Sequence, residues 1–142
     1  VWVQTWTLSP RPTEEAAALL AQLKVDAANA IDNAAGEART KYITIAPGQE
    51  GTYLLKAQRA RELSAKNYQG PVPILIQAEM DATGATVQQA CADILAQEAA
   101  WEYKAGQIET ARRIGKERVK AATTSAEING NRDDTLSALA QL

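Results

Sequence analysis

The sequence predicts an all-α protein: a long antiparallel helical hairpin or bundle, preceded by one short N-terminal β-strand. Three observations support this prediction. Alanine fills 29 of the 142 positions and recurs at helical spacing. Phenylalanine is absent and aromatic residues make up only 5% of the chain, too few for the core of a sandwich or barrel. Convincing strand-like alternation is confined to the first eight residues.

The first expected element is a strand over residues 1–8, VWVQTWTL. Alternation places Trp2, Trp6 and Leu8 on one side of it. A Pro-rich linker reaching residue 12 then ends the strand, because proline lacks an amide donor. No second strand is expected, so the backbone needs a partner strand from another copy or another protein. We therefore expect the two indoles to dock on a neighbouring subunit, with packing on the chain's own helices as the alternative.

The first long helix is expected over residues 13–41, with Thr13 as its cap and two glutamates in its first turn. Small and medium apolar residues recur along it in heptad phase. Such a stripe lets another helix approach closely. Its members are Ala16, Leu20, Leu23, Ala27, Ala30, Ala34 and Ala38.

The next segments predict a reversal of the chain. An aromatic and β-branched run at 42–45 leads into a Pro-Gly turn, and a second amphipathic helix follows over 49–66, roughly antiparallel to the first. Residues 67–73, which include two prolines, form the clearest linker. A short helix over 74–81, ended by the Ala-Thr-Gly segment at 82–84, is expected to close one end of the hairpin.

The longest helix is expected over residues 86–127, capped by Thr86. Two stripes of residues seven apart run along this helix, a main one and a companion one beside it. The companion stripe includes the charged residues Glu98 and Arg112, so we expect the helix to pack in patches instead of forming a continuous coiled-coil seam. The segment 129–131, Asn-Gly-Asn, is expected to break the helix before a short terminal turn. The main stripe comprises Val87, Ile94, Trp101, Ile108, Gly115 and Ala122.

Charge and chemistry exclude most function classes. The formal net charge is −2, which argues against nucleic acid as a partner, and no apolar run is long enough to span a membrane. A basic cluster within 112–120 is interpreted as a solvated helix face, with a phosphate or an acidic partner as the alternative. The chain begins with Val1 instead of Met, which is interpreted as a processed chain, a fragment or a start codon that was read differently.

Catalysis is also not expected. Histidine is absent and Cys91 is the single cysteine, which excludes the usual zinc sites and nucleophile–His arrangements within this chain. Cys91 is expected to be a small apolar packing residue instead of a reactive thiol. Paired carboxylates fit helix capping and solubility, and the Pro-Gly turn before residue 52 lacks the lysine of a phosphate loop. We expect no catalytic residue, no cofactor and no metal.

The segment from Ala38 to Gln49, ARTKYITIAPGQ, followed by Thr52, Tyr53 and Lys56, resembles a stretch in small Ala-rich proteins encoded beside tail-fibre genes of tailed bacteriophages. The resemblance covers roughly residues 25–66. The opening residues 1–12 also look like the tail of a phage fibre polypeptide. This resemblance implies a virion tail component or a tail-assembly protein without catalysis.

The function expected from the resemblance is a non-catalytic structural component of a bacteriophage tail, in the fibre or baseplate region. The alternative is a tail-fibre assembly chaperone or adaptor that is not retained in the virion. The expected partners are other tail proteins and further copies of the chain, with a trimer favoured, in the virion and in the host cytoplasm during assembly. The expected interface residues are Trp2, Trp6, Leu8, Ala30, Ala34 and Trp101.

Overall fold

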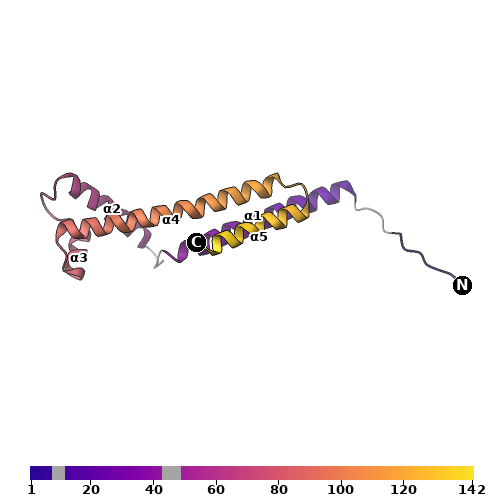
Figure 1. Ribbon diagram of the computed structural model, residues 1–142, viewed down its shortest axis with the longest axis horizontal. Helices are drawn as coiled ribbons and strands as arrows, with labels where there is room; N and C mark the ends of the chain where they lie inside the picture. Colours follow the sequence, from indigo (N-terminus) through magenta and orange to yellow (C-terminus); the bar gives the residue numbers. More distant parts are fainter. Residues whose placement is uncertain (8–11, 43–48) are drawn as a thin grey trace. The chain divides into compact units, whose positions relative to one another are not determined.

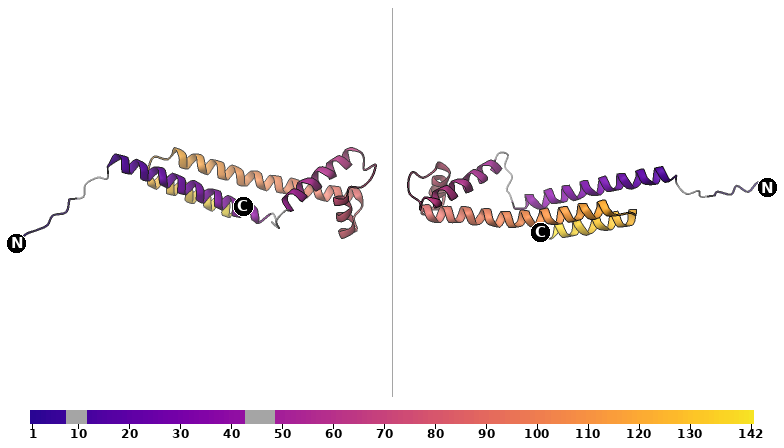
Figure 2. Two further views of the ribbon diagram at one scale, coloured as in Figure 1. Left: turned by 180° about the vertical axis from the view of Figure 1, so that it is seen from behind. Right: turned by 90° about the horizontal axis from the view of Figure 1, so that it is seen from above.

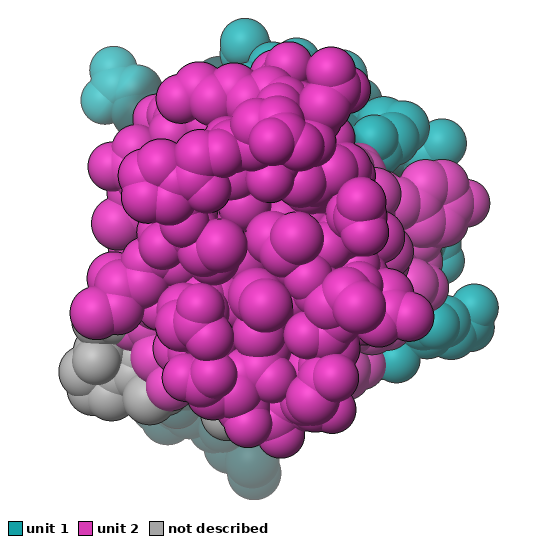
Figure 3. Space-filling view, turned by 90° about the vertical axis from the view of Figure 1, so that its left-hand side faces the viewer, with its two compact units in different colours: residues 1–36, 110–141 teal, residues 37–109, 142 magenta. Residues whose placement is uncertain are grey.

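The computed structural model describes residues 1–7, 12–42 and 49–142, and its described part contains five helices (Figure 1). The predicted all-helical class is confirmed. The chain divides into two compact units instead of one bundle over 13–142: unit 1 comprises residues 1–36 and 110–141, and unit 2 comprises residues 37–109 and 142 (Figure 3). The helices are α1 (Thr13–Thr40), α2 (Gln49–Ala65), α3 (Ile74–Thr83), α4 (Val87–Ala121) and α5 (Ser125–Ala140).

The predicted N-terminal strand is not shown. Residues 1–7 carry no regular secondary structure, and Leu8 and the first proline of the linker lie outside the described residues. The physical reason is pairing: a strand is held by hydrogen bonds to a neighbour, and the described part of this chain offers no other strand to supply them. The run at 43–45 and its Pro-Gly turn also lie outside the described residues.

Unit 1 packs α1, the C-terminal part of α4 and α5 around a core of small and branched residues. Each helix buries one stripe, as expected for an amphipathic helix in a globular unit. Figures 1 and 2 show α5 running back beside the end of α4. The buried residues are Ala27, Ile31 and Ala35 from α1, Gly115 and Val119 from α4, Ala122 from the connection, and Ile128, Thr135 and Leu139 from α5.

The buried stripe of α1 departs from the predicted heptad seam by one residue. Ala27 and Ala38 are buried as predicted, but between them the stripe runs through Ile31 and Ala35, while Ala30 and Ala34 are only half-buried. The four buried positions are on average about 3.7 residues apart, close to the 3.6 residues per turn of a straight helix, whereas the strict alternation of three and four that supercoiled helices require averages 3.5.

Polar contacts fix α1 against α4 in unit 1. The Asp32 carboxylate accepts from Arg112 at 2.7 Å and from Lys116 at 2.6 Å. Eight residues earlier on α1, the Lys24 ammonium donates to the Lys120 carbonyl at 2.7 Å, near the C-terminal end of α4, where a positive charge is favourable. Residue numbers rise along α1 as they fall along α4, so these two segments are antiparallel.

The predicted end of the longest helix was wrong. The long helix ends at Ala121, and residues 122–124 form the break. The Asn-Gly-Asn segment at 129–131, which was expected to end the long helix, lies inside α5. The Thr124 hydroxyl accepts from the Glu127 amide, and the Glu127 carboxylate accepts from the Thr123 amide at 2.7 Å. These bonds satisfy amides at the start of α5 that have no partner within the helix.

Unit 2 packs α2, α3 and the first half of α4 (Figure 2). Met80, Val72 and Tyr68 cover the edge of its core. Between α3 and α4, Gly84 takes a left-handed conformation with φ 72° and donates to the Met80 carbonyl, as predicted for a helix stop. Thr86 exchanges hydrogen bonds with Gln89 at the start of α4. The core residues are Ala57, Ala60, Leu63, Ile76, Ala90, Cys91 and Ile94.

The charged positions of the α4 companion stripe carry interhelical ion pairs. Glu98 pairs with Arg61 of α2 inside unit 2, and Arg112 pairs with Asp32 of α1 inside unit 1. Helix α4 therefore packs in patches, as expected, with apolar contacts separated by ion pairs. The expected hairpin between residues 13–41 and 49–66 involves helices of different units and stays a prediction. None of the helices in the described ranges combines the length and apolarity needed to cross a bilayer.

Candidate functional site

The N-terminal segment, residues 1–7, is the first candidate site. Trp2 is 101% exposed and Trp6 is 84% exposed, so neither indole is covered by the described part of its own chain. Val3 is also exposed, and the segment carries no charged side chain. Two unburied indoles on an uncharged segment are unusual on a protein surface, since tryptophan gains most from burial at an interface.

The remaining predicted interface residues are distributed differently. Ala30 and Ala34 lie one turn apart on α1 in unit 1, and both are half-buried. Trp101 of α4 is half-buried in unit 2. The structure thus leaves part of each side chain accessible to a partner, and the assignment of these residues to an interface stays a prediction. Leu8 lies outside the described residues.

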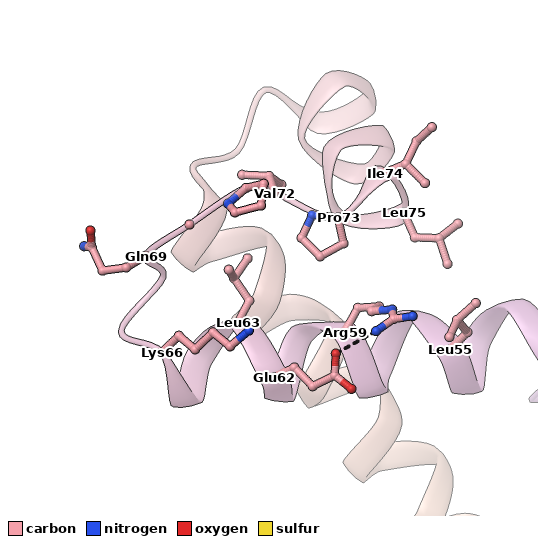
Figure 4. Close-up of a pocket in the computed structure, with 12 residues that line it drawn as sticks. Leu55, Arg59, Glu62, Leu63, Lys66, Gln69, Val72, Pro73, Ile74 and Leu75 are labelled. Carbon is pink, nitrogen blue, oxygen red and sulfur yellow. Dashed lines mark hydrogen bonds and ion pairs between the residues drawn. The ribbon is translucent and has the colours of Figure 1, made fainter.

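A second candidate site, which the sequence interpretation missed, is a groove between α2 and α3, with a cavity volume of about 590 Å³ (Figure 4). We call it the α2–α3 groove. Its size lies within the range of about 300 to 1,000 Å³ that is typical of ligand pockets. Ile74 at its rim is 83% exposed. The lining residues are Leu55, Arg59, Glu62, Leu63, Lys66, Gln69, Gly70, Pro71, Val72, Pro73, Ile74 and Leu75.

One wall of the groove is the connection between α2 and α3, in which the chain reverses direction tightly at Asn67 and Tyr68. The Tyr68 amide donates to the Leu63 carbonyl at 2.9 Å, and Asn67 and Tyr68 both have positive φ, 50° and 61°. Asparagine adopts this left-handed conformation more readily than most residues, whereas tyrosine requires support from its surroundings. Tyr68 packs against the core of unit 2, which supplies that support.

The charges in the groove are arranged along α2. Arg59 donates to the Glu62 carboxylate at 2.8 Å, and Gln58 donates to the same side chain. These bonds, with that of Arg59 the stronger, hold the pKa of Glu62 below its usual range. Lys66 adds a further cation one turn along. An apolar groove with cations at its side can accept an aromatic group by burial and by cation–π contact.

The other polar groups of interest have structural partners. Cys91 is buried and burial raises the pKa of its thiol, which agrees with the predicted packing residue. In the basic cluster, Arg112 and Lys116 are paired with Asp32, so the prediction of a wholly solvated face was wrong for these two. Asp133 pairs with Arg132. Within the described ranges, no cluster of three Cys, Asp or Glu side chains is arranged to hold a metal ion.

The groove could have been suspected from its leucine and isoleucine doublets. Residues 54–55 and 74–75 each place two successive apolar side chains about 100° apart around a helix, so one face cannot bury both, and Leu55, Ile74 and Leu75 of these four line the groove. No protein-family model, curated protein or solved structure matches the chain. The expected kinship with phage tail proteins therefore stays a prediction based on the motif at residues 38–56.

Proposed function

We propose that this chain is a non-catalytic structural component of a bacteriophage tail, in the fibre or baseplate region, and that it acts through helix packing and oligomerisation. The observation that carries the proposal is the full exposure of Trp2 and Trp6 in a chain otherwise poor in aromatic residues. A segment with two uncovered indoles is a natural attachment element, since tryptophan dominates the energetics of many interfaces. The placement in a phage tail is supported by the sequence motif at residues 38–56.

The helices serve this function as spacers and packing surfaces. Both units have cores rich in alanine and isoleucine, held in register by ion pairs such as those of Asp32 and Arg61. In this proposal the helices over 13–41 and 49–66 associate in antiparallel fashion. The chain forms a trimer, with contacts through Ala30 and Ala34. Residues 1–8 are extended in this proposal and add a strand to the sheet of a partner protein.

An assembly chaperone or adaptor that leaves before the virion is complete is the second candidate. The observation that favours it is the open α2–α3 groove, whose rim residue Ile74 is largely exposed. A surface of this kind can hold an apolar segment of another protein reversibly. The same chain could then occur in the host cytoplasm during assembly and be absent from finished particles.

Mass spectrometry of purified phage particles separates the two candidates. A structural component is expected at a fixed stoichiometry relative to the other tail proteins, and it should survive high-salt washing of the particles. An assembly factor is expected in infected-cell lysate and absent from the particles. Absence from both particles and assembly intermediates would contradict the tail assignment.

A further inference from the structure

We draw no further inference here: the strongest candidate, the α2–α3 groove of unit 2 with the exposed Ile74 at its rim (Figure 4), carries none because nothing in the described part of the chain shows what covers it.

Discussion

Gly115 of α4 lies directly against Thr135 of α5. A Cβ atom at position 115 would lie 2.4 Å from both the Cγ2 and the Oγ1 atoms of Thr135, far inside van der Waals contact. Thr135 is itself buried, and its hydroxyl donates to the Asn131 carbonyl at 2.7 Å. The absence of a side chain at Gly115 is therefore what allows α4 and α5 to approach this closely.

Gly115→Ala is expected to lower the free energy of unfolding by about 1 to 3 kcal/mol, because the added methyl group overpacks the contact. Urea denaturation followed by circular dichroism measures the change. The control is Gly106→Ala in the same helix, where a Cβ would meet nothing within 4 Å. That substitution should raise stability by about 0.5 to 1 kcal/mol, since alanine favours the helix.

The double variant Gly115→Ala/Thr135→Ala should recover part of the loss, because it removes the two Thr135 atoms that lie 2.4 Å from the new methyl group. The coupling energy from the double-mutant cycle should therefore be clearly different from zero. Equal losses for Gly115→Ala in the presence and absence of Thr135 would show that the two helices do not meet at this point.

Asp32 should make stability depend on pH. Hydrogen bonds from Lys116 and then from Arg112 hold the pKa of Asp32 below its usual value of 3.8. A lowered folded-state pKa means that this contribution is complete above about pH 4 and is lost as the pH falls through the folded-state value. Because Asp32 is partly exposed, solvent screening limits the contribution to about 0.5 to 1 kcal/mol.

Asp32→Asn should therefore destabilise the protein at pH 7 and have little effect near pH 2. Urea denaturation at a series of pH values measures the difference. Asp26→Asn is the control, since it removes the same charge from an exposed position of α1. A constant difference between wild type and Asp32→Asn across the pH range would contradict the role assigned to the ionised carboxylate.

Thr124→Ala should shorten α5 at its N-terminal end and cost about 1 kcal/mol, because the Glu127 amide loses the hydroxyl that accepts its hydrogen bond. Thr124→Ser retains this oxygen and should remain close to the wild type. Thermal unfolding compares the three proteins. A serine variant as unstable as the alanine variant would show that the methyl group of Thr124, and not its hydroxyl, is the important part.

Ala34 and Ala35 are neighbours on α1, and leucine substitutions at the two positions test which of them faces the core of unit 1. Ala35 is 0% exposed in unit 1, so Ala35→Leu should cost about 1 to 3 kcal/mol through overpacking. Ala34 is half-buried, so Ala34→Leu should cost less in the single chain. Light scattering adds the second comparison: an oligomer weakened by Ala34→Leu would support the proposed contact through Ala30 and Ala34, and an unchanged oligomer would place that face in water.

Local signals in the sequence were sufficient for much of the fold. The helix starts at Thr13 and Gln49 were predicted, as were the stop at Gly84 and the cap at Thr86, because each depends on residues within one turn. The α4 stripe through Ile94, Ile108 and Gly115 is buried as its heptad spacing predicts.

The errors arose where tertiary contact outweighs local preference. Gly130 was expected to break a helix, but it lies in α5, where the packing of Ile128 and Thr135 offsets the low helix propensity of the Asn-Gly-Asn segment. The Thr-x-x-Glu sequence at 124–127 is the local signal for the start of α5, because its side chains cap the first turn. The α2–α3 groove depends on how two helices meet across the reversal at Asn67, which spacing along the chain does not determine.

We propose that the chain works by association through its exposed N-terminal tryptophans. Multi-angle light scattering of the full chain, beside a version that lacks residues 1–7, tests it most directly. We expect a multiple of 15.2 kDa for the full chain, and a monomer of unchanged helical content for the shortened one. A full chain that stays monomeric at every concentration, or a shortened chain that assembles equally well, would contradict it.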